Sequence, residues 1–199
     1  MKTNSIAVLL SLVLAANTVH STTITWTNTA GGNWSVAANW SPNQVPGTGN
    51  IAVLPDVGDS YAVNLDSPAL VSGLVVGATS GANTQTFNNP SQTLTVNGVI
   101  QINSQGAFNV EGGEIAGTNA LSGTLNWTGG TLTGVMTVSN NGVLNIATFG
   151  NTIGFQHLTL TNYGTVNWTN TTINSGLGTQ IYNYGLWNAQ SDDGFVGGA

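Results

Sequence analysis

Gly106-Ala-Phe108-Asn109-Val110 is the first of five short stretches that share one pattern. The pattern is a glycine, any residue, a bulky apolar residue, an asparagine and a residue that is usually apolar. It returns at Gly123, Gly142, Gly164 and Gly185, and successive asparagines are separated by 17, 19, 22 and 21 residues. A short strand that recurs at about the length of one coil is typical of a solenoid whose coils stack on one another.

Alternating apolar residues flank each stretch and extend the repeat on both sides. Ile100-Gln-Ile102 precedes the first stretch, and Ile115 follows it after a Gly112-Gly113 turn. Glycine and asparagine tolerate the positive φ that sharp corners require. We therefore predict three short strands per coil and an all-β parallel β-helix with coils of about 20 residues. A leucine-rich repeat would need a denser leucine pattern, and a β-sandwich would not repeat one asparagine in the same context.

The five repeated asparagines are the strongest candidates for a shared role. In stacked coils they would lie one above another and hydrogen-bond as a ladder, because each amide both donates and accepts. The predicted structural ladder comprises Asn109, Asn126, Asn145, Asn167 and Asn188. We expect these asparagines to be buried at corners, which places Trp127 and Trp168 inside the coil. If the two tryptophans lie outside instead, they form an aromatic stripe for stacking on glycan rings.

The first 21 residues have the features of a secretory signal peptide. Lys2 supplies a positive start, Ile6 to Leu14 are mostly apolar, and Val19-His20-Ser21 offers a cleavage site. The apolar run is too short to span a bilayer. We therefore expect residues 1–21 to be removed and the protein to be secreted or at the cell surface.

The remaining chain contains seven acidic residues, no lysine, no arginine and no cysteine. Without basic residues it cannot neutralise phosphates, so a nucleic-acid partner is excluded. An arginine clamp on a carboxylate or phosphate is excluded for the same reason. No other segment reaches the length of a membrane span.

Residues 22–50 differ in composition from the repeats. Trp26, Trp34 and Trp40 are close together here, among glycines and prolines. The first coil of a solenoid exposes an apolar end and an unpaired strand edge. We predict that residues 22–50 form a tryptophan-rich cap and that residues 51–199 form the β-helix. We expect regular coils by about Leu74 and a β-helix that is incomplete at its C-terminus.

The stretch from Trp26 to Pro42, with its repeated Asn-Trp-Ser and the following Val45-Pro46, resembles the opening of secreted bacterial surface proteins of the autotransporter or adhesin type. The resemblance implies an opening segment before parallel β-helical repeats, and a secreted or surface location. These proteins also carry a translocator barrel, a sorting motif or an anchoring helix, none of which follows here. We therefore expect the chain to be a fragment of a longer protein.

Candidate catalytic and metal-binding residues are few. Glu111 and Glu114 flank one turn and could approach the carboxylate separation of a glycoside hydrolase. Asp192-Asp193 resembles the paired aspartates of polygalacturonase-type β-helices, but the histidine and the Arg-Lys pair of that family are missing. Asp56 and Asp59 offer a weak calcium site. His157 has no metal-binding neighbour in sequence.

These observations favour a non-catalytic structural or adhesive stalk, or passenger segment, of a secreted or cell-surface bacterial protein. We expect no enzyme activity and no cofactor. We expect the partners to be glycans or host and matrix surfaces. The alternative is a carbohydrate-binding or carbohydrate-active β-helix whose active part lies beyond residue 199. The sequence determines neither the ligand nor the oligomeric state.

Overall fold

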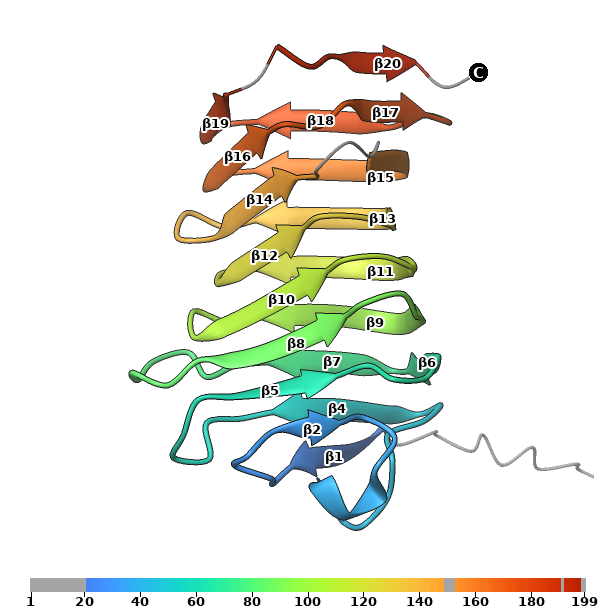
Figure 1. The fold of residues 1–199 in the computed structure, drawn as a ribbon, viewed down its shortest axis with the longest axis vertical. Coiled ribbons are helices and arrows are strands. Elements are labelled where there is room, and N and C mark those ends of the chain that lie inside the picture. The colour runs from blue at the N-terminus through green and yellow to red at the C-terminus, as the bar shows by residue number, and fades with distance from the viewer. Residues whose placement is uncertain (1–20, 149–152, 191, 198–199) are drawn as a thin grey trace, which may run out of the picture.

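The computed structural model describes residues 21–148, 153–190 and 192–197. These residues form a stack of short strands that follows one long axis (Figure 1). The expected signal peptide, residues 1–21, lies outside the described residues except for Ser21. Apart from one short 3-10 turn, η1 (Ala37–Asn39), the regular structure is all strand. The all-β class predicted from the sequence is therefore confirmed.

The strands form two sheets that face each other across the core. Sheet A contains β1 (Thr22–Trp26), β3 (Trp40–Ser41), β4 (Asn50–Leu54), β6 (Ala69–Val71), β7 (Gly73–Val76), β9 (Thr93–Ile102), β11 (Glu114–Leu121), β13 (Thr131–Val138), β15 (Ile153–Asn162), β17 (Ile173–Gly176), β18 (Gln180–Asn183) and β20 (Phe195–Gly197). Sheet B contains β2 (Gly32–Asn33), β5 (Tyr61–Asn64), β8 (Gln85–Asn89), β10 (Gly106–Val110), β12 (Thr124–Trp127), β14 (Val143–Ala147), β16 (Thr165–Thr169) and β19 (Leu186–Ala189).

Apart from β3, each strand pairs in parallel with the equivalent strand of a neighbouring coil. In sheet B the order β19-β16-β14-β12-β10-β8-β5-β2 follows the direction of the chain, and each connection crosses over through sheet A. In sheet A, β11 pairs in parallel with β9 on one side and with β13 on the other. The winding repeats about seven times at about 21 residues per turn. The predicted parallel β-helix is therefore confirmed, together with its coil length.

The long strands β9 and β15 of sheet A bend between two parts, so the coils that contain them have three segments, two in sheet A and one in sheet B. The first part of β9 pairs with β6 and its last part with β7, and β15 pairs in the same way with β17 and β18. Gly117 and Gly134 lie in register at the bend, and both have positive φ (150° and 96°). In β15 the register shifts at this place, where His157 has a φ of 54°. His157 therefore occupies a bend in the backbone.

The glycine that opens each repeated stretch has a different role. A Cβ at Gly123 would lie 2.1 Å from the carbonyl oxygen of Asn103, and one at Gly164 would lie 2.2 Å from that of Ser139. Neither of these two glycines has a φ in the positive region. The repeated glycine is required because one coil passes directly over the backbone of the coil before it.

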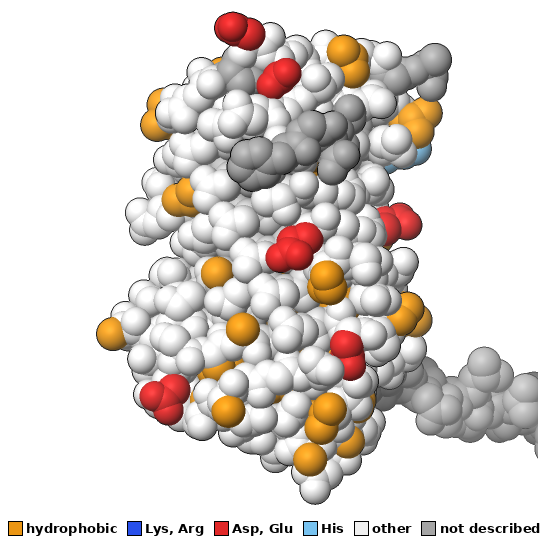
Figure 2. Space-filling view, in the orientation of Figure 1, with side chains coloured by type: hydrophobic (Ala, Val, Ile, Leu, Met, Phe, Trp, Pro, Cys, Tyr) orange, Lys and Arg blue, Asp and Glu red, His pale blue; other side chains and the backbone are white. Residues whose placement is uncertain are grey.

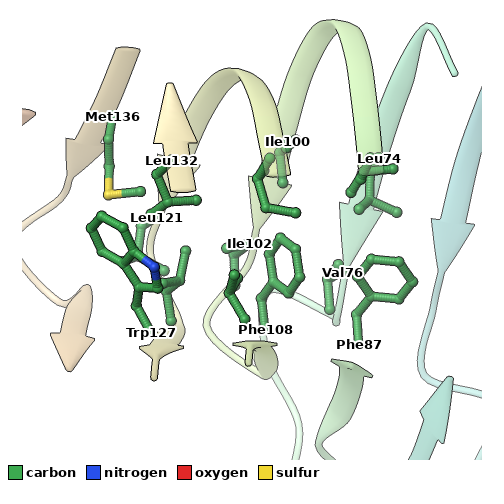
Figure 3. Close-up of a cluster of buried hydrophobic side chains, with 14 of the residues drawn as sticks. Leu74, Val76, Phe87, Ile100, Ile102, Phe108, Leu121, Trp127, Leu132 and Met136 are labelled. Carbon is green, nitrogen blue, oxygen red and sulfur yellow. The ribbon is translucent and has the colours of Figure 1, made fainter. Parts of the chain in front are cut away.

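Apolar side chains from both sheets fill the interior in columns, one residue per coil (Figure 3). Phe87, Phe108 and Leu125 are in register on sheet B, and all three are buried. Opposite them, Leu74 and Ile100 are in register on sheet A. Because strand residues alternate between faces, every second residue enters this core and the others lie on the outside.

The N-terminal end is closed by the tryptophan cluster. Trp26, Trp34 and Trp40 are buried, and the Trp40 ring packs edge-on against the other two with centroid distances of 5.0 and 4.8 Å. Strand β3 pairs antiparallel with β1, so it covers the edge of sheet A. Strand β1 itself pairs in parallel with β4. The β-helix therefore starts at Thr22, earlier than expected, and the cap proper is the segment that folds back after β2.

Candidate functional site

The asparagine ladder is present and runs along sheet B. Asn126 Nδ2 donates to Asn109 Oδ1, Asn145 Nδ2 to Asn126 Oδ1, and Asn167 Nδ2 to Asn145 Oδ1, each at 2.8 Å. Asn188 Nδ2 donates to Asn167 Oδ1 at 3.3 Å. The five predicted residues therefore form one continuous file of hydrogen-bonded amides, each donating toward the N-terminal end.

The ladder is longer than the sequence predicted. Asn109 Nδ2 donates to Asn88 Oδ1, and Asn88 Nδ2 donates to Asn64 Oδ1, both at 2.8 Å. The repeated stretch begins with glycine, but Gln85 and Tyr61 stand at that position in these two coils. Because these two coils lack the glycine, the sequence pattern did not predict Asn64 and Asn88 as ladder residues. The pair of an apolar residue followed by asparagine, as in Phe87-Asn88, was the signal that could have found them.

The asparagines face outward, which corrects the expectation that they are buried at corners. Asn109, Asn126, Asn145, Asn167 and Asn188 lie within strands and are half-buried, whereas the residues on either side of Asn126 point into the core. The strands of sheet B alternate without a bend at the asparagine. The ladder therefore forms a ridge of amides on the outer face of sheet B, which lies toward the viewer in Figures 1 and 2.

Trp127 and Trp168 are inside the coil, as expected, and so cannot stack on a glycan. Trp127 is fully buried and stacks on Phe155 at 5.0 Å with an interplanar angle of 12°. The Nε1 of Trp168 donates to the carbonyl oxygen of Thr171 at 2.7 Å, and its ring packs against Phe195. Both indoles are core residues, so the possibility that they form an outer aromatic stripe is wrong.

The acidic candidates for catalysis lie on the surface. Glu111 and Glu114 are exposed, and so are Asp192 and Asp193 at the last coil. Asp56 accepts hydrogen bonds from the Gly58 N–H at 2.8 Å and from Asn83 Nδ2 at 3.1 Å. In the described parts of the chain, no three histidine, cysteine or acidic residues lie close enough to hold a metal ion. The weak calcium site at Asp56 and Asp59 therefore gains no further ligand.

The pKa values of two side chains near the N-terminal end, Tyr61 and Asp66, are shifted from their ordinary values. Burial raises the pKa of Tyr61, and the nearby Asp56 carboxylate raises it further. The Tyr61 hydroxyl donates to the carbonyl oxygen of Pro55 at 2.7 Å. At Asp66, partial desolvation raises the pKa, but hydrogen bonds from the Ser35 hydroxyl and N–H outweigh it and hold the pKa below its ordinary value. The Ser35–Asp66 contacts tie the N-terminal segment to the following coil, and the Tyr61–Pro55 contact holds the loop between β4 and β5, so both are structural.

The described residues contain no pocket, and none of their helices is long and apolar enough to cross a membrane. No protein-family model, curated protein or solved structure matches this chain. The resemblance to autotransporter-type surface proteins therefore remains a prediction from the sequence. The candidate functional feature is the outer surface of sheet B, where the asparagine ladder lies.

Ladder position should determine how much each asparagine contributes to stability. Asn145→Ala removes two 2.8 Å hydrogen bonds from the middle of the file, whereas Asn188→Ala removes one bond of 3.3 Å at its end. We expect a loss of about 1–2 kcal/mol in unfolding free energy for Asn145→Ala and less than about 0.5 kcal/mol for Asn188→Ala. Urea unfolding of the two variants measures the difference. Equal losses would show that the amides act independently rather than as a ladder.

Proposed function

We propose that this chain is a rigid, non-catalytic stalk or passenger segment of a secreted or cell-surface bacterial protein. The observation that carries the proposal is the continuity of the structure along its axis. One hydrophobic core and one file of amides run from the first coils to Asn188 without a break. Because each coil is hydrogen-bonded to the next along its full width, bending the rod would strain every ladder at once. A rigid rod of this kind suits a spacer that holds another part of the protein away from the cell surface.

The composition supports a place outside the cytoplasm. Strand β1 begins at Thr22, directly after the expected cleavage site at Ser21, so removal of residues 1–21 leaves both sheets intact. The fold contains no cysteine and depends on hydrogen-bonded ladders and apolar columns instead of disulfides. The face shown in Figure 2 is mostly backbone and uncharged polar side chains, with scattered acidic and hydrophobic side chains.

We prefer the structural role to the carbohydrate-active alternative. That alternative depended on outward tryptophans or on two carboxylates across a groove. Both tryptophans are buried, and Glu111 and Glu114 are exposed next to a turn rather than in a cleft. A carbohydrate-binding role needs a different set of aromatic residues, which is considered below.

Export and protease resistance test the proposal together. We expect the full chain, expressed in a bacterium with an outer membrane, to leave the cytoplasm and to lose residues 1–21. Mass spectrometry of the exported protein should give Thr22 as its first residue. Chymotrypsin should then leave one large resistant body, because most aromatic side chains lie inside the coil. Trypsin provides no test here, since the mature chain has no lysine or arginine.

Deletion of residues 2–21 is the matched control, and this variant should fold but stay in the cytoplasm. Cytoplasmic retention of the full chain would contradict the proposed location. Rapid cleavage inside the repeats, into pieces of one or two coils, would contradict a rigid rod.

A further inference from the structure

Two exposed tyrosines occupy equivalent places on the last two coils of sheet B. Tyr163 and Tyr184 each precede the glycine that opens the repeated stretch. The N–H of Tyr163 donates to the carbonyl oxygen of Val138, and that of Tyr184 to Asn162, both at 2.8 Å. The two rings stack with a centroid distance of 5.3 Å and an interplanar angle of 14°. The side chains are nevertheless 48% and 68% exposed, so they form an aromatic step on the surface.

The aromatic step lies beside the asparagine ladder, at the corner where the chain enters sheet B. Thr165 and Asn167 point outward from β16 and alternate with the buried residues 166 and 168, and the exposed Tyr163 lies in the bend that leads into this strand. The next coil repeats the row, since Thr165 is in register with Leu186 and Asn167 with Asn188. We call these two rows the tyrosine–asparagine surface: Tyr163, Thr165, Asn167, Tyr184, Leu186 and Asn188. Leu186 is 58% exposed and extends the apolar part between tyrosine and amide.

This surface has unused hydrogen-bonding capacity beside its apolar part. Each interior ladder amide uses one of its two N–H groups and one oxygen lone pair within the file, so the others remain for a ligand. The hydroxyls of Tyr163 and Tyr184 have no hydrogen-bond partner among the described residues. The Tyr163 and Tyr184 rings stack on each other, and both side chains keep large exposed areas.

We propose that the tyrosine–asparagine surface binds a neutral polysaccharide. A pyranose ring with equatorial substituents presents a flat C–H face that packs on an aromatic ring, while its hydroxyls donate to and accept from amides at the rim. The surface contains no charged residue, and the mature chain has no cation with which to bind an anionic polymer. A β-linked gluco-configured chain matches these requirements. The proposal goes beyond the stalk role and does not depend on export.

Pull-down of the mature chain with insoluble polysaccharides tests the proposal. The probes are microcrystalline cellulose and chitin as neutral polymers and calcium-gelled polygalacturonate as an anionic one. We expect binding to at least one neutral polymer and a weakening of about ten-fold for Tyr184→Ala, since a stacked aromatic contact contributes on that order. Tyr184→Phe should retain binding because it keeps the ring. Both side chains are exposed, so thermal unfolding should be almost unchanged.

Tyr182→Ala is the matched control. Tyr182 belongs to the same coil and is 45% exposed, but it lies in β18 of sheet A and donates its hydroxyl to Gln180. This variant should bind like the unmodified protein. Equal weakening by Tyr182→Ala, no effect of Tyr184→Ala, a preference for polygalacturonate, or no binding to either neutral polymer would each overturn the proposal. So would a Tyr184→Ala effect on self-association, measured by sedimentation, with polysaccharide binding unchanged.

Discussion

Trp40→Ala is expected to lower the unfolding free energy by about 3–5 kcal/mol, the usual cost of removing a large buried aromatic side chain. Trp40 is only 1% exposed, and its ring contacts both Trp26 and Trp34. Its Nε1 also donates to the carbonyl oxygen of Trp34 at 2.9 Å, so the substitution leaves a buried acceptor unpaired. Urea unfolding followed by tryptophan fluorescence measures the loss.

The same substitution should also cause self-association. Trp40 anchors β3, and β3 is the strand that covers β1 at the edge of sheet A. A released β1 would offer an unpaired edge to another molecule. Light scattering of Trp40→Ala at increasing concentration should therefore rise before the protein unfolds.

Trp187→Ala is the matched control at the opposite end. Trp187 is only half-buried in the last sheet B strand, and its ring is 6.2 Å from that of Phe195. We expect Trp187→Ala to lower the unfolding free energy much less than Trp40→Ala does, and to leave self-association unchanged. If the two variants lose equal stability, the tryptophan cluster is not a specific cap.

The sequence predicted those features that depend on a repeated local pattern. The asparagines that follow Leu125 and Leu144 stand in the same local context, so their alignment in the fold could be anticipated from spacing alone. The direction of these side chains could not be anticipated in the same way. Whether an asparagine marks a corner or stands within a straight strand depends on where the bend falls, and the bends lie in sheet A at Gly117 and Gly134.

The aromatic step illustrates what spacing could have revealed. Asn162-Tyr163-Gly164 and Asn183-Tyr184-Gly185 repeat one tripeptide at a spacing of one coil, so extending the repeat by one residue would have aligned the two rings. From the sequence, only Trp127 and Trp168 were predicted as possible glycan contacts. Burial of Trp127 follows from strict alternation after an outward asparagine, and this was the physical rule that decided the outcome.

Hydrogen-bond satisfaction in the core cannot be read from spacing at all, and Asn119 shows the consequence. Its side chain is fully buried, and neither Oδ1 nor Nδ2 has a partner among the described residues. In register with it on the neighbouring coils are Ile100 and Met136, both buried. An amide in an apolar column loses its contacts with water and gains nothing in return.

Asn119→Leu should therefore stabilise the protein by about 1–3 kcal/mol, because leucine has the same branched skeleton and removes the unpaired groups. For a chain of this size, the midpoint of thermal unfolding should rise by about 2–4 °C for each kcal/mol. The matched control is Asn162→Leu. Asn162 is equally buried, but its Nδ2 donates to Asn183 Oδ1 at 2.7 Å and its Oδ1 accepts from the Gly164 N–H at 3.0 Å.

The two substitutions should have opposite signs, since one removes an unpaired amide and the other leaves its partners unpaired. Asn162→Leu is expected to cost about 1–3 kcal/mol. A destabilising effect at both sites would mean that Asn119 is hydrogen-bonded in solution, for example to a buried water. A gain at Asn119 alone would show that this asparagine is retained for a reason other than stability.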